Sequence, residues 1–151
     1  MPEISLFLDS SALVSGVISA EGASRVLLLL AETGHIKAII SEQVLAESER
    51  AIARKVPRAI NDFRQAILAS RVQIVRDAAA DEVSENLELI SHAADVPIVL
   101  SAMQAQVDYL VTLNRVHFID DPGVAQKSGL RIGTPGDALH WVRERISSAG
   151  Q

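Results

Sequence analysis

The sequence predicts an α/β fold, a three-layer sandwich in which helices cover both faces of a central parallel sheet of four to five strands. Short apolar runs without polar alternation, such as residues 4–8 and 36–40, are typical of strands buried on both faces. Segments with helical periodicity lie between these runs, and this alternation is typical of parallel α/β proteins. Because the chain is 48% hydrophobic but only 3% aromatic, we expect a core of Ala, Val, Ile and Leu.

Turn and capping signals give the order of the elements. Strands are predicted at residues 4–8, 36–40, 72–75, 109–112 and 130–132. Helices are predicted from Gly22-Ala23 to Thr33-Gly34, over residues 42–54, 58–69 and 79–92, from Asp95-Val96-Pro97, and from Thr134-Pro135. Ser41 is a suitable N-cap for the helix at 42–54, and Pro97 lies in a first turn, where its missing N–H costs no hydrogen bond.

The length of the chain predicts one domain. A domain of 151 residues buries about 68–70% of the surface that its unfolded chain exposes. No internal repeat, low-complexity stretch or linker interrupts the sequence. We therefore expect a single domain over residues 1–146 and a frayed C-terminus over residues 147–151.

Composition excludes several classes of function. The absence of cysteine excludes disulfides, thiolate nucleophiles and cysteine zinc sites. The four histidines (His35, His92, His117 and His140) show no i, i+4 pairing of metal ligands. The net charge of −5 has the wrong sign for a general nucleic-acid coat protein. It is compatible with a nuclease, because acidic residues around a metal lower the net charge.

Membrane segments are not predicted. The longest apolar run, residues 26–31, is far too short to span a bilayer. The N-terminus carries Glu3 and lacks the basic region of a signal peptide. We expect a cytoplasmic protein with no membrane partner.

Polar residues at the ends of the predicted strands mark a candidate site. In open parallel sheets, sites form beyond the carboxyl ends of the strands. Asp9 ends the first strand, Asp95 opens the helix before the strand at 109–112, and Asn114 follows that strand. Glu47 lies about two turns into the helix after the second strand, so it can project over the same edge.

Carboxylates of this kind suit Mg²⁺ or Mn²⁺, which prefer oxygen ligands. Such ions activate water and neutralise the charge of a phosphate. Each acid also has a structural interpretation, with Asp9 and Asp95 as helix N-caps and Glu47 as part of a solvated helix face. Only the fold hypothesis brings the three together, since spacing alone does not.

Four segments carry a family resemblance that covers nearly the whole chain. LFLDSSALVSGVIS is similar to a first strand with a catalytic Asp and a following Ser or Thr. SEQVLAESERAI is similar to a segment that bears a Glu, and Glu47 is the matching position. DVPIVLSAMQAQVDYLVTLNRVHF, the most specific of the four, is similar to the stretch with the third acid and the fourth strand, and LRIGTPGDALHWV to the last strand and helix. The family that these segments resemble is that of the PIN domains, in particular the branch related to VapC-like toxins.

The resemblance implies a metal-dependent ribonuclease that hydrolyses RNA phosphodiesters and is the toxin component of a toxin–antitoxin pair. It places the catalytic and metal-binding roles on Asp9, Glu47 and Asp95, with Mg²⁺ or Mn²⁺ as the cofactor and Glu47 as a ligand or as the group that orients the water. Ser10, with Ser11 beside it, would support the first carboxylate. An antitoxin partner and a homodimer are also implied.

The densest basic stretch follows Glu47 and is the predicted contact for RNA phosphates. Its members are Arg50, Arg54, Lys55, Arg58 and Arg64. An ordinary solvated helix surface is the alternative interpretation.

One position departs from the family pattern. After the fourth strand the family usually has an Asp, where this chain has Asn114. An amide offers a neutral oxygen but no charge, so we expect Asn114 in a supporting role and one metal rather than two. Asp120 and Asp121 follow closely enough to substitute, whereas Asp108 precedes the strand, at its opposite end.

Three alternative functions fit parts of the pattern. A haloacid-dehalogenase-like phosphatase needs a second Asp two residues after the first, where this chain has Ser11, and a Rossmann-type nucleotide binder needs a Gly-rich turn that DSSALVSG does not provide. The third is a PIN-like domain that has lost catalysis and acts through protein partners, which Asn114 motivates. Convergent carboxylates favour the enzyme, and acids splayed apart or paired with Arg or Lys favour the binding module.

Overall fold

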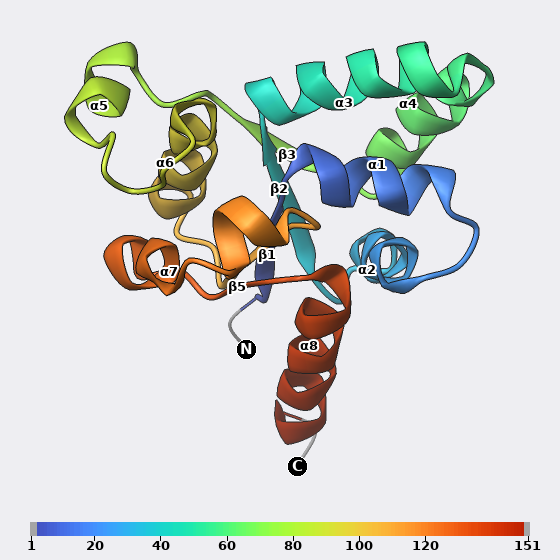
Figure 1. Ribbon diagram of the computed structural model, residues 1–151. Coiled ribbons are helices and arrows are strands. Elements are labelled where there is room, and N and C mark those ends of the chain that lie inside the picture. The colour runs from blue at the N-terminus through green and yellow to red at the C-terminus, as the bar shows by residue number, and fades with distance from the viewer. Residues whose placement is uncertain (1–2, 150–151) are drawn as a thin grey trace.

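A parallel sheet lies at the centre of the molecule (Figure 1), whose computed structural model describes residues 3–149. The strands are β1 (Ser5–Leu8), β2 (Lys37–Ser41), β3 (Gln73–Val75), β4 (Tyr109–Val111) and β5 (Ile132–Gly133). They are hydrogen-bonded in the order β3-β2-β1-β4-β5, and every neighbouring pair is parallel. This confirms the predicted α/β class and the predicted number of strands.

Helices flank the sheet in two groups. They are α1 (Ser10–Ile18), α2 (Ala23–Glu32), α3 (Glu42–Lys55), α4 (Ile60–Ala69), α5 (Ala80–Glu85), α6 (Val96–Gln104), α7 (Pro122–Ser128) and α8 (Pro135–Ala149), with short 3₁₀-helices η1 (Pro57–Ala59) and η2 (Ala93–Asp95) and a π-helix η3 (Arg115–Ile119). Helices α1 to α4 pack together, with α8 against α2, whereas α6 packs between α5 and α7 (Figure 1). The result is the predicted three-layer sandwich.

The central strands are buried on both faces. Leu6 and Phe7 of β1 and Leu110 and Val111 of β4 have no exposed surface. Because helices cover both sides of these strands, successive buried positions are apolar and the alternation of a half-exposed strand is absent. This burial explains why the apolar runs of the sequence predicted these two strands.

The direction in which strands are added reverses between β1 and β4. Strands β2 and β3 lie on one side of β1, and β4 and β5 on the other. The carboxyl ends of β1 and β4 therefore flank a topological switch point, where open α/β sheets form their sites. The N–H of Asp9 donates to the carbonyl of Val111 at 3.1 Å, which places Asp9 beside Thr112 at this edge.

Several predicted helix ends are confirmed. Ser41 caps α3, since its hydroxyl accepts the Val44 N–H at 3.3 Å. Beyond α2, Gly34 has φ +81°, a conformation that glycine adopts without strain. At the start of α8, the Thr134 N–H donates to Asp137 Oδ2 at 3.0 Å, and the Asp137 N–H donates back to Thr134 Oγ1 at 3.1 Å.

The helix predicted over residues 79–92 is wrong beyond Glu85. Helix α5 ends there, and the Asn86 side chain donates to the carbonyl of Glu82 at 2.7 Å. A side-chain amide that bonds the backbone in this way competes with continuation of the helix. Leu89 and Ile90 are buried nonetheless, so this non-helical segment is still held to the core.

Other boundaries also differ from the expectation. Helices α1, η3 and α7 lie in segments where the sequence predicted none, and the strand predicted at 130–132 is Ile132–Gly133. Residues 147–149, expected to be frayed, continue α8, whereas residues 150–151 lie outside the described part of the chain. Within residues 3–149 no single helix is long and apolar enough to cross a membrane, although α1 and α2, bent by 87°, meet that test of length and composition as a pair.

Candidate metal centre

Asp9 stands at the carboxyl end of β1, where its two oxygens face different partners. Oδ1 accepts from the Ser11 hydroxyl at 2.6 Å and from the Ala12 N–H at 2.9 Å, which caps α1. Oδ2 accepts from the hydroxyl of Thr112, at the end of β4. Since a carboxylate has about four lone-pair sites, these three donors leave one acceptor position, on Oδ2.

The Asp9 side chain is almost wholly buried. Burial raises the pKa of the Asp9 carboxyl above its ordinary value, and the negative charge of Asp95 adds to that rise. The hydrogen bonds from Ser11, Thr112 and Ala12 lower the pKa but do not cancel the effect of burial. The ionised carboxylate is therefore incompletely compensated by the protein, and a cation beside Oδ2 would supply the missing charge.

Glu47 reaches the same region from α3. Its Oε2 accepts from the Ser10 hydroxyl at 3.2 Å, and its Oε1 from the Gln43 amide at 2.8 Å. The Gln43 amide also donates to the carbonyl of Ala94 at 3.3 Å. Glu47 is thus linked on one side to the start of α1 and on the other to the residue before Asp95.

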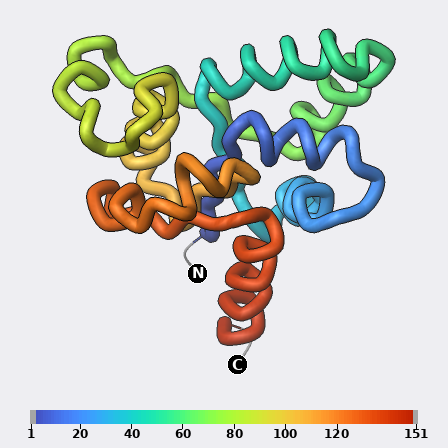
Figure 2. Tube along the Cα trace, in the orientation of Figure 1, coloured from blue at the N-terminus to red at the C-terminus, as the bar shows by residue number. Residues whose placement is uncertain are grey.

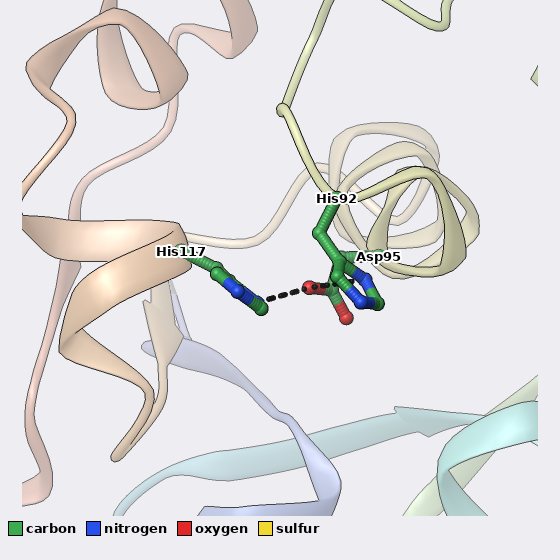
Figure 3. A group of neighbouring side chains, drawn as sticks. All are labelled: His92, Asp95 and His117. Carbon is green, nitrogen blue, oxygen red and sulfur yellow. Dashed lines mark hydrogen bonds and ion pairs between the residues drawn. The ribbon is translucent and has the colours of Figure 1, made fainter.

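Asp95 is the last residue of η2 and lies at the N-cap position of α6, but its side chain makes no capping hydrogen bond. Instead, its Oδ2 lies 3.1 Å from His117 Nδ1 and 3.5 Å from His92 Nδ1 (Figure 3). The carboxylate is not engaged with the backbone of α6 and faces the site.

Asn114 joins the two halves of the site. Its Oδ1 accepts the His117 N–H at 3.1 Å, and its Nδ2 lies 3.1 Å from His117 Nδ1. The Asn114 N–H donates to Thr112 Oγ1 at 2.9 Å. Asn114 therefore connects Thr112, the partner of Asp9, to His117, the partner of Asp95.

These contacts, together with the peptide links Asp9–Ser10 and Ala94–Asp95, form a closed ring that includes all three predicted acids. Its members, in order, are Asp9, Ser10, Glu47, Gln43, Ala94, Asp95, His117, Asn114 and Thr112. The ring members lie at or near the starts of α1, α3, α6 and η3, which Figure 2 draws in blue, teal, gold and orange. In the part of the chain that the structure describes, no Arg or Lys forms an ion pair with Asp9, Glu47 or Asp95.

The basic residues predicted to contact RNA lie outside the ring. Arg50, Arg54 and Lys55 are exposed on α3, and Arg58 is exposed on η1. Lys55 lines a groove of about 460 Å³ between α1 and α3, and two residues at the start of α1, Ser10 and Ser11, line it as well. Arg64, by contrast, pairs with Glu49 at 3.1 Å.

The other nearby acids do not join the ring. Asp121 caps α7 by accepting the Gly123 N–H at 2.9 Å, so it does not substitute for the missing family Asp. Asp120 is exposed at the end of η3. Asp108 accepts the Ser5 N–H at 2.8 Å, at the opposite end of β4 as expected.

Four residues at the site were not singled out from the sequence. Gln43 lies one turn before Glu47, on the same face of α3, Thr112 directly follows β4, and His92 precedes Asp95 by three residues. These sequence positions could have predicted Gln43, Thr112 and His92 as members of the site. His117 depends on the π-helix η3, for which we find no signal in the sequence.

The family model of the PIN domain matches residues 5–116. This match spans most of the chain and includes Asp9, Glu47, Asp95 and Asn114. The chain belongs to the PIN domain family. No curated protein matches it.

Solved structures share the fold of this PIN domain. PAE2754 from Pyrobaculum aerophilum is 15% identical with a TM-score of 0.65, over 93% of this chain and 96% of that one. VapBC2 from Rickettsia felis, bound to a DNA fragment from its promoter, is 22% identical with a TM-score of 0.60, over 87% and 98%. VapC20 from Mycobacterium tuberculosis, a toxin that cleaves the sarcin–ricin loop, is 15% identical with a TM-score of 0.52, over 70% and 86%.

Proposed function

We propose that this PIN domain is a metal-dependent ribonuclease that hydrolyses RNA phosphodiesters. The observation that carries the proposal is the ring of contacts that gathers Asp9, Glu47 and Asp95 at the topological switch point. The ring links the three acids, and none of them pairs with an Arg or Lys in the described residues, which favours an enzyme over a binding module. Membership of the PIN family supports the same conclusion.

We assign a divalent ion to Asp9 and Asp95, with Glu47 as a further ligand or as the residue that orients the water. The donor set fits, because Asp9 Oδ2 has an acceptor position that no protein group occupies, and carboxylate oxygens suit Mg²⁺ or Mn²⁺. When bound, such an ion lowers the pKa of a water and neutralises charge on the phosphate.

Glu47 is the residue best placed to accept a proton from the attacking water. Ser10 and Gln43 each hold one of its oxygens, so the carboxylate is fixed in orientation, yet each oxygen keeps a further lone pair. Ser11 and Thr112 orient Asp9 in the same way. Their role is to hold the acids in place rather than to react.

We assign the phosphate backbone of the RNA to the groove between α1 and α3. Lys55 lines this groove together with Ser10 and Ser11, so it connects the carboxylates to the exposed basic face. Arg50, Arg54 and Arg58 extend that face. Charge reversal at Lys55 is expected to lower the affinity for RNA and to make that affinity less dependent on salt concentration.

We further propose that the chain is the toxin of a toxin–antitoxin pair, that it is cytoplasmic, and that it forms a homodimer. Similarity in fold to VapBC2 and VapC20 supports this assignment. Expression of the wild type, but not of Asp9→Asn, should then slow the growth of a host cell.

Cleavage of total cellular RNA by Glu47→Gln and Glu49→Gln tests the ribonuclease. Both residues lie on α3, but Glu49 pairs with Arg64 and lies outside the ring. We expect Glu47→Gln to lower the rate roughly 10²-fold or more, as for loss of a general base, and Glu49→Gln to leave it unchanged. Cleavage that persists in EDTA, or an equal rate in both variants, would overturn the proposal.

A wild type that binds Mn²⁺ but cleaves no RNA would instead favour a PIN domain that acts through protein partners. Asn114 is the observation behind that alternative, since both polar atoms of its side chain contact His117 and it brings no charge to the site.

A further inference from the structure

A second group of potential metal ligands lies beside the carboxylates and is rich in nitrogen. His92, Asp95 and His117 each offer one ligand atom, and these atoms lie within 4.8 Å of one another. Figure 3 shows the Asp95 carboxylate beside the two imidazole rings, whose centroids lie 4.5 Å apart. The ring nitrogens Nδ1 of both histidines face the same oxygen, Asp95 Oδ2, at 3.1 and 3.5 Å.

Two separate elements bring these residues together. His92 is the N-cap residue of the short helix η2 and Asp95 is its last residue, so the helix brings their side chains together. The π-helix η3 carries His117. Single π-helical turns are rare and occur frequently at functional sites. Asn114 caps η3 by accepting the backbone N–H of His117, which holds the start of η3 in place.

We propose that His92, Asp95 and His117 form a site for a transition-metal ion of the zinc type. Imidazole nitrogen suits Zn²⁺ and its neighbours, whereas carboxylate and water suit Mg²⁺. Two histidines and one carboxylate give three protein ligands and leave a fourth position open, a pattern of accessible zinc sites. The site shares Asp95 with the carboxylate centre proposed above but differs from it in the ions it selects.

The separations fit such an ion after a small movement of side chains. Ligand atoms about 2.1 Å from a tetrahedral ion lie about 3.4 Å from one another, close to the two distances at Asp95 Oδ2. The rings must turn, because they are stacked with planes only 20° apart, and the lone pairs of nearly parallel rings do not meet. The side chains of His92 and His117 are 51% and 34% exposed, which leaves room for this rotation.

In the metal-free protein the His117 Nδ1–H donates to Asp95 Oδ2 at 3.1 Å, and His92 Nδ1 lies 3.5 Å from the same oxygen. A metal ion that takes the place of the proton would bind side chains that are already close together. Little conformational entropy of these side chains is therefore lost on binding. The three side chains are thus neighbours before the ion binds, and only the two rings have to turn.

Zinc titration of histidine variants tests the inference without any assay of activity. Zn²⁺ is titrated in competition with a chromophoric chelator, and Co²⁺ is followed by its visible absorption. We expect His92→Ala and His117→Ala each to weaken Zn²⁺ binding at least tenfold and to abolish the Co²⁺ absorption band. Mn²⁺ binding should be retained in both variants, because Asp9, Glu47 and Asp95 are intact.

His140→Ala is the matched control. His140 also contacts a carboxylate, Glu144, at 3.1 Å, but these two residues belong to no group of three ligands among the described residues. Unchanged Zn²⁺ affinity in His92→Ala and His117→Ala, or an equal loss in His140→Ala, would overturn the inference. Because His92 is half exposed, its removal leaves the fold intact and the test decisive even where His117→Ala unfolds.

The test of the zinc site is independent of the test of ribonuclease activity. Loss of Zn²⁺ binding in the histidine variants supports this site whether or not the chain cleaves RNA. Conversely, RNA cleavage that depends on Glu47 supports the ribonuclease even where Zn²⁺ does not bind.

Discussion

At the scale of single residues, Asp9 divides two roles between its oxygens. Oδ1 caps α1 through the Ala12 N–H, and Oδ2 faces Thr112 and keeps a free acceptor position. From sequence, a cap and a metal ligand were competing interpretations of this residue. The geometry allows both roles, because a carboxylate has enough lone pairs to cap the helix and to bind an ion at the same time.

Asp9→Asn should raise the melting temperature of the metal-free protein at neutral pH. Burial raises the pKa of Asp9, so the ionised form costs stability above that pKa, and the cost disappears as the pH falls through it and the carboxyl is protonated. Thermal unfolding in EDTA should therefore show an advantage of the variant that is largest near neutral pH and shrinks toward acid. A variant less stable than the wild type at neutral pH contradicts this account.

Asp9→Ala separates the charge from the cap. Asn retains an N-capping oxygen, whereas Ala does not, and loss of an N-cap costs about 1 kcal/mol. Asp9→Ala should thus be less stable than Asp9→Asn by roughly this amount at every pH. Equal stabilities would show that the cap of α1 is not formed in solution.

Asn114→Asp should increase the affinity for Mn²⁺. One oxygen of the new Asp would still accept the His117 N–H, as Asn114 Oδ1 does, and the side chain would add a negative charge between Thr112 and His117. Calorimetric titration of Mn²⁺ into both proteins measures the change. No change in affinity would show that position 114 is remote from the metal.

At the scale of elements, the strands were predictable and several helices were not. The middles of strands β1, β2 and β4 are apolar runs because both of their faces are buried. Helix α1 lacks such a signal, since it is rich in Ser and contains Gly16. The structure explains that glycine, because a Cβ there would lie 2.7 Å from Leu28 Cδ1 of α2. This contact between helices cannot be read from local sequence.

Ser41→Ala should destabilise the protein by about 1 kcal/mol, the typical cost of losing an N-cap. Ser41 is buried and caps α3, the helix that carries Glu47. Ser84→Ala is the control, because the exposed Ser84 hydroxyl bonds only the carbonyl of Ala80 within its own helix, a contact that does not stabilise helices. Chemical denaturation of both variants compares them, and equal losses would argue against the cap.

At the scale of the whole molecule, strand order decides which residues meet. The order β3-β2-β1-β4-β5 puts the ends of β1 and β4 side by side, and so joins Asp9 to Thr112 and Asn114. Sequence spacing carries no such information, and the resemblance to PIN domains is what predicted the trio of acids. The same resemblance did not reveal His92 and His117, which depend on how η2 and η3 pack in this chain.

Mn²⁺ should stabilise the whole fold by binding only its native state. At a concentration 100 times the dissociation constant the gain is about 2.7 kcal/mol, which for a domain of this size raises the melting temperature by roughly 5–10 °C. Thermal unfolding at increasing Mn²⁺ measures this gain, and Asp9→Asn should lose most of it. A rise of the same size in the variant would place the ion elsewhere.

The central claim is that Asp9, Glu47 and Asp95 hold a divalent ion that serves RNA cleavage. Its most direct test is a calorimetric titration of Mn²⁺ into the wild type and Asp9→Asn, with RNA cleavage assayed on the same samples. We expect the wild type to bind Mn²⁺ and cleave, and Asp9→Asn to lose both while remaining folded. A wild type that binds no Mn²⁺ would contradict the claim and identify the chain as a partner-binding domain with the fold of a nuclease.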